Sequence, residues 1–276
     1  MGDYLRPARL EEALEALARP CTVLAGGTDF FPARVGHAID ENILDISNIG
    51  ALRGISRKGD GWRLGATVTW SELAAADLPP LFDGLKQAAR EVGGRQIQNA
   101  GTLAGNLCNA SPAADGVPPL LALDAEVELA SCGGQRRLAL SQFITGNRRT
   151  ALAPGELLVA IHVPGTARET RSAFVKLGAR RYLVISIVMA AATLEIADGR
   201  VAAARIAVGA CSAVAQRLPL LEAALVGAPV DARLADRIEP VQLAPLAPID
   251  DVRASSGYRR DAALVLLRRL LTEVVP

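Results

Sequence analysis

The chain has 276 residues, of which 50% are hydrophobic and 21% charged, a balance that excludes intrinsic disorder and allows a substantial buried core. Thirty basic and 29 acidic residues give a formal charge of +1, which excludes the basic surface of a nucleic-acid-binding protein and a polybasic membrane anchor. The four cysteines, Cys21, Cys108, Cys132 and Cys211, form no CxxC pair, so we expect no zinc or iron–sulfur cluster within this chain and a reducing, cytoplasmic location.

The N-terminal part of the chain predicts a small parallel α/β unit. Leu10–Ala18 has apolar residues at helical spacing and acidic residues in its first turn, which predicts a short amphipathic helix. Thr22–Leu24 is typical of a buried strand that ends at two glycines, and Asn42–Ile46 is typical of a second strand. A strand, a crossover and another strand in so short a stretch favour parallel pairing.

The next part of the chain predicts a strand followed by two helices. Trp62–Val68 alternates as a strand does. Thr69 and Glu72 have the spacing of a capping box, which predicts the start of a helix over Trp70–Ala76. Leu81–Val92 predicts a second, amphipathic helix that two glycines close.

The rest of the chain predicts a hairpin, a boundary and then an α+β unit. The hairpin pairs Ala125–Ala130 with Gln135–Leu140 across a glycine turn, and the strand Leu157–Val163 follows it. The polar stretch Pro164–Arg171 is the candidate domain boundary. Beyond it we expect strands over Ser172–Leu177, Leu183–Ile196 and Val201–Gly209, and helices over Leu218–Leu225, Ala232–Ile238 and Ser256–Leu271.

Two features bear on targeting. The first residues, Met1–Arg9, are polar and predict no signal peptide. The longest apolar run, Leu183–Leu194, is interrupted by polar residues and is too short for a membrane span.

The first candidate binding segment is Leu24–Asp29, which reads LAGGTD. Two glycines after a strand let the main chain turn tightly and approach a ligand closely, and the successive N–H groups of such a turn can hold phosphate oxygens. An ordinary turn at the end of a strand is the alternative. The segment is neither a P-loop nor a GxGxxG motif.

The second candidate segment is Asn99–Asp115, which has neither a helical nor a strand period and predicts a long irregular, functional stretch. Within it, Thr102 and Asn106 flank small residues and can offer side-chain hydrogen bonds. Asp115 either caps the helix that follows or accepts hydrogen bonds from sugar or ribityl hydroxyls. Two glycine-bearing segments suit an elongated ligand that carries two phosphates.

These segments resemble the two flavin loops of one family, the FAD-binding subunits of molybdenum hydroxylases such as carbon monoxide dehydrogenase and xanthine dehydrogenase. The resemblance rests on AGGTD, on NAGTLAGNLCNASPAAD and on the Val117–Leu123 run after it. It continues in Phe174–Arg181, which is similar to the family's F-x-K-x-G-x-R segment, and in Tyr258–Arg260 with Arg268 and Arg269 near the end. The similarity covers nearly the whole chain in order.

The resemblance implies an α+β fold. Its first part is a vanillyl-alcohol-oxidase (PCMH)-type FAD-binding domain of two α/β subdomains, expected over residues 1–167 and divided at about 52/53. A smaller C-terminal α+β domain is expected over residues 168–276.

The resemblance also implies the cofactor and its contacts. The diphosphate of FAD lies between the two loops, and Asp115, Val92, Leu158 and Lys176 match further flavin contacts by position. Without the family, the favoured interpretation of Lys176 is a solvated charge at a strand edge. The expected cofactor-binding residues are Leu24, Ala25, Gly26, Gly27, Thr28, Asp29, Phe30, Phe31, Val92, Thr102, Leu103, Ala104, Gly105, Asn106, Asp115, Leu158 and Lys176.

One departure from the family concerns the second loop, where Ala104 replaces the first of two usual glycines. If that position needs a positive φ, alanine costs about 1 kcal/mol. The cysteines are not arranged for the [4Fe–4S] insert of some relatives, and neither His37 nor His162 is paired with a nucleophile. We therefore assign no catalytic side chain and no metal ligand.

The function implied is electron transfer within a larger complex. A large subunit with molybdopterin oxidises the substrate, a small [2Fe–2S] subunit passes electrons to FAD in this chain, and FAD reduces an external acceptor. The expected assembly is a dimer of heterotrimers. The alternatives are a self-sufficient PCMH-type flavin oxidoreductase, with Tyr182 or Glu156 as its acid or base, and a cofactor-free scaffold of the same fold, which Ala104 favours.

Overall fold

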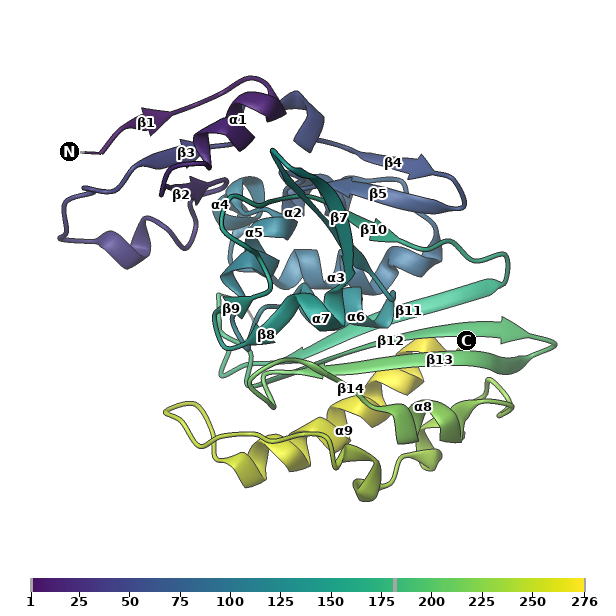
Figure 1. Cartoon of the computed structure of the whole chain (residues 1–276). Helices are drawn as coiled ribbons and strands as arrows, with labels where there is room; N and C mark the ends of the chain where they lie inside the picture. The colour runs from purple at the N-terminus through teal and green to yellow at the C-terminus, as the bar shows by residue number, and fades with distance from the viewer. Residues whose placement is uncertain (1, 181–182, 276) are drawn as a thin grey trace.

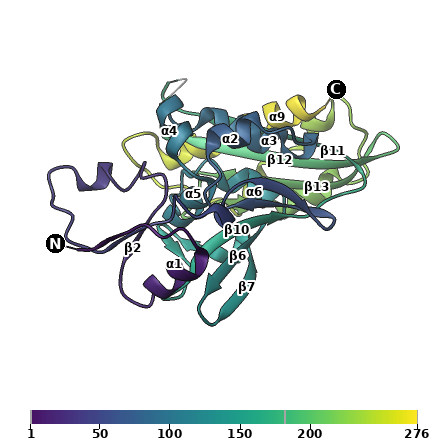
Figure 2. The ribbon, with the colours of Figure 1, turned by 90° about the horizontal axis from the view of Figure 1, so that it is seen from above.

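The computed structural model describes residues 2–180 and 183–275, and most of its strands form three sheets (Figure 1). The N-terminal sheet lies at one end of the molecule, and the five-stranded sheet follows it. Helices pack between the five-stranded sheet and the C-terminal four-stranded sheet, and two more helices cover the far face of the latter. Seen from above, the N-terminal unit lies to one side of this stack (Figure 2).

The N-terminal sheet is the predicted parallel unit. Its central strand pairs in parallel with both neighbours, which confirms the predicted parallel pairing. An exposed arm connects its second and third strands and carries a short 3-10 helix. The elements are β1 (Tyr4–Leu5), α1 (Leu10–Ala16), β2 (Thr22–Leu24), η1 (Pro32–Arg34) and β3 (Ile43–Asp45).

The second sheet is antiparallel and has the order β4-β5-β10-β6-β7. The predicted hairpin forms its β6–β7 edge, and the predicted strand Leu157–Val163 is its buried centre. Its strands are β4 (Ile55–Lys58), β5 (Gly61–Gly65), β6 (Glu126–Ser131), β7 (Gly134–Ala139) and β10 (Leu157–Val163), and a separate two-stranded sheet joins β8 (Ile144–Gly146) to β9 (Arg149–Thr150).

Helices follow β5 and pack against this sheet. The capping box is confirmed, because the Thr69 hydroxyl accepts the Glu72 N–H and the Glu72 carboxylate accepts the Thr69 N–H. The elements of this part are η2 (Gly50–Leu52), α2 (Trp70–Ala75), η3 (Pro80–Phe82), α3 (Asp83–Glu91), α4 (Arg95–Ala100), α5 (Leu103–Asn109), α6 (Val117–Ala122) and α7 (Leu140–Phe143).

The prediction that Asn99–Asp115 is irregular throughout is wrong, because Leu103–Asn109 forms helix α5. Thr102 caps this helix, and Leu103 and Leu107, four residues apart, are both fully buried on its inner face. The small residues between them hide the helical period in the sequence. The helix ends at Ala110, whose φ of 46° is left-handed.

The C-terminal part packs a four-stranded antiparallel sheet against α3 and α6 on one face and α8 and α9 on the other. The predicted pairing of two long strands across Asp198-Gly199 is confirmed, but the first of them begins at Val188 rather than Leu183. The elements are β11 (Glu169–Leu177), β12 (Val188–Ala197), β13 (Arg200–Gly209), β14 (Gln216–Arg217), α8 (Pro219–Leu225), η4 (Leu234–Arg237), η5 (Pro240–Leu243) and α9 (Ser256–Val274).

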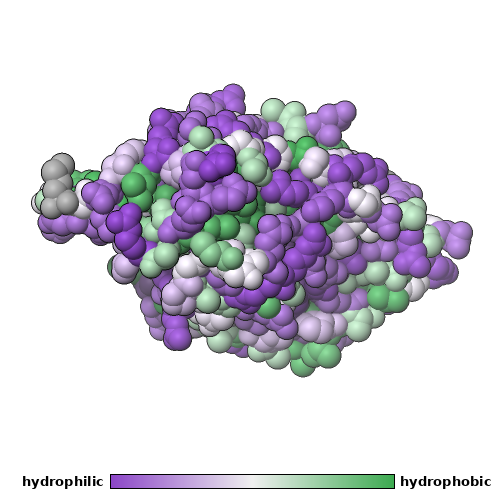
Figure 3. Space-filling view, turned by 45° about the horizontal axis from the view of Figure 1, so that its top comes forward, coloured by the Kyte–Doolittle hydropathy of each residue, from purple (hydrophilic) through white to green (hydrophobic). Residues whose placement is uncertain are grey.

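The core has two main parts. One lies between the five-stranded sheet and helices α2–α6, and the other lies between the C-terminal sheet and α8 and α9. Hydrophilic side chains cover most of the face in Figure 3, with hydrophobic ones visible between them near the centre of the view. None of the described helices combines the length and apolar composition that crossing a bilayer requires.

Candidate cofactor-binding site

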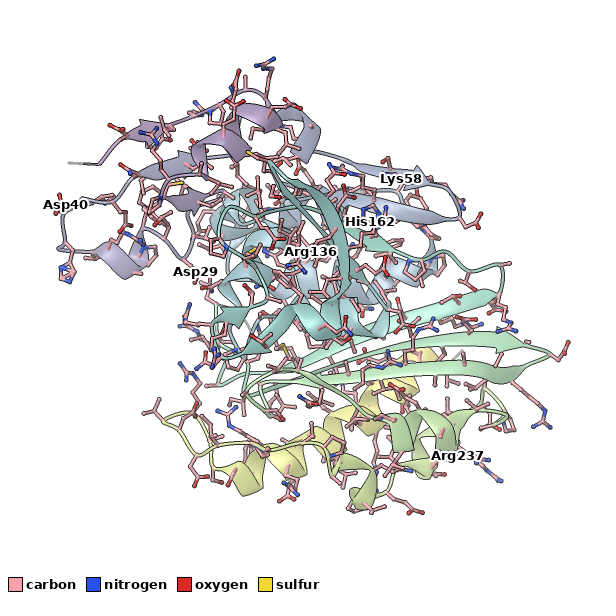
Figure 4. The ribbon with its side chains drawn as sticks, viewed as in Figure 1. Asp29, Asp40, Lys58, Arg136, His162 and Arg237 are labelled. Atoms are coloured by element: carbon pink, nitrogen blue, oxygen red, sulfur yellow. The ribbon has the colours of Figure 1, made fainter. Side chains whose placement is uncertain are left out.

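A cavity of about 900 Å³ lies where the N-terminal unit meets α5 and β10, and its size is near the upper end for ligand pockets. One wall is the segment that follows β2, on which Figure 4 shows Asp29, and the opposite wall is α5. The predicted site residues that line it are Leu24, Ala25, Gly26, Gly27, Thr28, Asp29, Phe30, Val92, Thr102, Ala104, Gly105, Asn106 and Leu158.

The turn after β2 requires its two glycines. A Cβ on Gly26 would lie 1.8 Å from the carbonyl oxygen of Ala100, so no side chain fits there. Gly27 has a φ of 70°, and a Cβ on it would meet the Phe31 ring at 2.6 Å. The close approach of Gly26 to the residues just before Thr102 brings the two predicted segments together.

The same turn leaves main-chain donors unused. Among the residues that the structure describes, the N–H groups of Gly26, Gly27 and Thr28 donate no hydrogen bond, although all three residues line the cavity. Successive free N–H groups of this kind bind anionic oxygens. The residues present therefore fit the diphosphate of a dinucleotide.

The opposite wall is held by its own hydrogen bonds. The Thr102 hydroxyl accepts the Gly105 N–H at 3.0 Å, and the Asn106 side-chain oxygen accepts the Gly116 N–H at 3.2 Å. Ala104 lies within α5 and has no positive φ. The predicted strain of alanine at this position is therefore absent.

Four of the expected site residues do not line the cavity. Phe31 is 55% exposed and packs edge-on against Phe30, and Leu103 is fully buried in the core on the inner side of α5. The other two, Asp115 and Lys176, form a buried ion pair behind the cavity wall, with 2.6 Å between Nζ and Oδ2.

This ion pair contradicts both alternative readings of its residues. Asp115 does not cap α6, and the Lys176 side chain is only 5% exposed rather than solvated. The second carboxylate oxygen of Asp115 accepts a 2.6 Å hydrogen bond from the Ser186 hydroxyl. Burial raises the pKa of the Asp115 carboxyl, while the Lys176 charge and the hydrogen bonds from Lys176 and Ser186 oppose that shift.

Several residues that the sequence did not identify also line the cavity. Arg148 has a φ of 53°, its N–H donates to the Ala110 carbonyl, and its guanidinium donates to Asn109. Cys108 also lines the cavity and is exposed. The further residues include Thr22, Val23, Pro32, Ala33, Arg34, Ile46, Ala66, Trp70, Ile97, Gly101, Asn109, Leu152 and Leu157.

Distance in the chain hides those that come from α2, from the residue after β3 and from the segment between β8 and β10, whereas residues 22–23 and 32–34 adjoin the first predicted segment. Within the exposed arm between β2 and β3, Arg34 contacts other residues of the arm. The Arg34 guanidinium lies 3.7 Å from the Phe30 ring centroid and is paired with Glu41.

The acid or base required by a self-sufficient oxidoreductase finds no support in Glu156. Its carboxylate lines the cavity but accepts hydrogen bonds from Arg136 at 2.6 and 2.8 Å, and this pairing lowers its pKa. Glu156 therefore stays ionised near neutral pH. The other candidate, Tyr182, and the neighbouring Arg181 of the Phe174–Arg181 segment lie outside the described residues.

Two family descriptions match the chain. Residues 1–166 match the FAD binding domain in molybdopterin dehydrogenase, and residues 173–274 match the CO dehydrogenase flavoprotein C-terminal domain.

The similar proteins agree with these matches over almost the whole chain. The xanthine dehydrogenase FAD-binding subunit of Escherichia coli O157:H7 is 32% identical, covering 99% of this chain and 96% of its own. The carbon monoxide dehydrogenase medium chain of Afipia carboxidovorans is 31% identical, covering 97% and 94%. A crystal structure of the Cu,Mo-CO dehydrogenase superposes with a TM-score of 0.90 at 29% identity, covering 99% of this chain and 97% of the other.

Proposed function

Because the chain belongs to the family of FAD-binding subunits of molybdopterin dehydrogenases, we propose that it receives electrons from a [2Fe–2S] small subunit. A large subunit with molybdopterin supplies those electrons by oxidising the substrate. The chain itself binds FAD, transfers electrons and is the medium subunit of a multi-subunit oxidoreductase.

The observation that carries the proposed site is the meeting of two glycine-bearing segments around unused main-chain donors. Gly26, Gly27 and Thr28 bind the diphosphate through their N–H groups, and Thr102–Asn106 closes the other side. The whole expected set serves the cofactor in this proposal. The residues on the cavity wall contact FAD, and Asp115, Lys176, Leu103 and Phe31 shape the site or reach FAD at its edge.

When bound, FAD supplies the electron chemistry, because a flavin takes up electrons singly and releases them as a pair. The chain's residues bind and orient it. Apolar residues of β2, α4 and β10, such as Leu24, Ile97 and Leu158, exclude water from the cavity.

Substrate choice belongs to another subunit in this proposal. The similar proteins are named for different substrates, xanthine and carbon monoxide, yet match this chain along its whole length. The only acid assigned to the self-sufficient alternative among the described residues, Glu156, is occupied by Arg136.

We extend the proposal to organisation. The FAD-binding domain ends at residue 167, with its subdomains divided at about residue 52, and the C-terminal domain follows over 168–276. The assembly is a dimer of heterotrimers. Its location is the cytoplasm, where the four thiols stay reduced.

The test is a titration of the purified full chain with FAD, followed by flavin fluorescence and the visible spectrum. We expect a Kd of about 1 μM or tighter, which corresponds to about −8 kcal/mol. ADP should compete because it carries the diphosphate, whereas riboflavin, which lacks it, should not. Absence of flavin uptake supports the scaffold alternative, and turnover of a small substrate without partners supports the self-sufficient one.

The assembly has its own test. Affinity-tagged chain expressed with its genomic neighbours should co-purify with a molybdopterin protein and a [2Fe–2S] protein in equal amounts. Recovery of the flavin-loaded chain alone under those conditions contradicts the proposed partners.

A further inference from the structure

Ser186 lies just before β12, outside the cavity, and its side chain is almost fully enclosed. It is 1% exposed, and its hydroxyl donates to Oδ1 of Asp115 at 2.6 Å. Lys176 donates to the other oxygen, so both oxygens of a carboxylate that is itself 7% exposed have a donor.

Two hydrogen bonds of Ile187 fix the main chain next to Ser186, one to β11 and one to α9. The Ile187 N–H donates to the Leu177 carbonyl at 2.8 Å, which extends the β11–β12 ladder. The Ile187 carbonyl accepts a 2.6 Å hydrogen bond from the buried guanidinium of Arg259 on α9. The Ser186 hydroxyl is therefore held on Asp115 by a rigid support.

The Asp115–Lys176 pair in turn adjoins two cavity-lining residues. Nζ of Lys176 lies 3.5 Å from the carbonyl of Glu91, the residue before Val92. Asp115 precedes Gly116, whose N–H fixes the side chain of Asn106. Val92 and Asn106 both line the cavity.

We propose that Ser186 is a positioning residue for the flavin site, which holds the Asp115 carboxylate so that Lys176 keeps its place behind the cavity wall and Val92 and Asn106 keep theirs on it. This inference rests on the proposed function. Without the Ser186 hydroxyl, Oδ1 of Asp115 is buried with no donor, and the carboxylate rotates or draws Lys176 away.

The test compares Ser186→Ala with Ser172→Ala in the full chain. Ser172 is the matched control, because its hydroxyl also joins the C-terminal sheet to the FAD-binding part, through the Pro80 and Leu81 carbonyls and the Gly84 N–H. It does not touch Asp115 and does not line the cavity. FAD affinity, the visible spectrum of bound flavin and thermal unfolding are measured for each variant.

We expect Ser186→Ala to weaken FAD binding about tenfold and to shift the flavin spectrum, since one charge-assisted hydrogen bond is lost. Ser172→Ala should lower the unfolding temperature but leave affinity and spectrum as in the wild type. Ser186→Thr, which keeps the hydroxyl, should restore affinity to within about threefold.

Equal FAD affinity in Ser186→Ala and the wild type overturns the inference, as does an equal loss in both alanine variants. If Ser186→Ala does not fold, Ser186→Cys replaces it, and an affinity equal to wild type overturns the inference, since a thiol is a weaker donor. If the wild-type chain itself takes up no FAD, it is the proposed function that fails.

Discussion

The two walls of the cavity differ in how they are held. The first wall, residues 25–34, is half-buried or exposed, and its 3-10 helix carries no buried residue. The second wall is one face of α5, whose other face places Leu103 and Leu107 in the main core. The first wall is an arm supported by its turn, and the second wall is part of a helix that is packed into the main core.

This difference separates two uses of glycine. In the first wall, Gly26 and Gly27 are required by a close approach and by a left-handed φ. In the second wall, the backbone is helical and tolerates Ala104 without strain. Similar sequence patterns thus serve a tight turn on one side and a capped helix on the other.

The largest effect is expected at the buried ion pair of Asp115 and Lys176, which lies behind the second wall. Asp115→Asn leaves the Lys176 ammonium buried without an opposite charge, which costs about 3–5 kcal/mol of the free energy of unfolding. Urea unfolding measures this loss. The control is Asp124→Asn, because Asp124 is 52% exposed and pairs with Arg217 and Arg205 at the surface, where the cost is below about 1 kcal/mol. Equal losses of stability in the two variants would contradict the claim that burial makes the Asp115–Lys176 pair costly to break.

The next effect is on the first wall. Gly26→Ala places a Cβ against the Ala100 carbonyl and pushes the turn away from α5, so we expect FAD affinity to fall about a hundredfold, close to 2.7 kcal/mol. Gly50→Ala is the control, because a Cβ there meets nothing within 4 Å and its φ is not positive. Wild-type affinity in Gly26→Ala would show that the turn does not need to touch the chain before α5.

A smaller effect distinguishes the α5 cap from caps elsewhere. Thr102→Val and Thr69→Val each remove a threonine that accepts an N–H three residues on, so each costs about 1 kcal/mol of stability. Only Thr102 lines the cavity, and only its loss should weaken FAD binding, by about fivefold. Equal FAD affinities in the two variants would remove α5 from the site.

The sequence predicts elements whose period is complete and local. The hairpin β6–β7, the buried strand β10 and the parallel pairing of β3 all follow from short patterns. The sequence does not reveal helix α5, because its buried face has only two leucines and the small and polar residues between them hide the helical period.

The site is predictable only in its local parts. The two glycine-bearing segments can be identified from the sequence, because residues adjacent in the chain determine the turn. Ser186 and Arg148 carry no local signal, since each depends on a partner 71 or 39 residues away. The ion pair of Asp115 and Lys176 was missed for the same reason, although each residue was singled out.

A further prediction separates stability from binding by pH. Burial lowers the pKa of His162, with Arg137 and Lys58 adding to the shift and its partner Glu128 opposing it, so the folded chain favours the neutral imidazole. The unfolded imidazole has a pKa of about 6.5. Above a pH of about 6.5 the stability is fully present. As the pH falls below this value, the unfolded chain binds a proton before the folded chain does, so stability is lost until the pH reaches the lower pKa of the folded imidazole.

Urea unfolding between about pH 8 and about pH 5.5 measures this loss, and His162→Gln should reduce the slope while the variant of the exposed His37, His37→Gln, keeps it. No histidine of the described chain lines the cavity, and His162 lies on another pocket with Lys58. Figure 4 labels both residues. FAD affinity should therefore stay constant over the same range. An FAD affinity that falls together with the stability would contradict this separation of binding from stability.

The smallest effect is expected at Ala104, the position that distinguishes this chain from its family's usual pattern. Ala104→Gly introduces glycine into a helix whose backbone needs none, so stability should fall by about 0.5–1 kcal/mol. FAD affinity should change by less than about twofold, because no strain is relieved at this φ. Leu107→Met, on the buried face of the same helix, controls for a mild loss of stability without a change in the cavity wall. A tenfold gain in FAD affinity for Ala104→Gly would show that α5 must loosen at its start to receive the cofactor, and the second wall would then be as adaptable as the first.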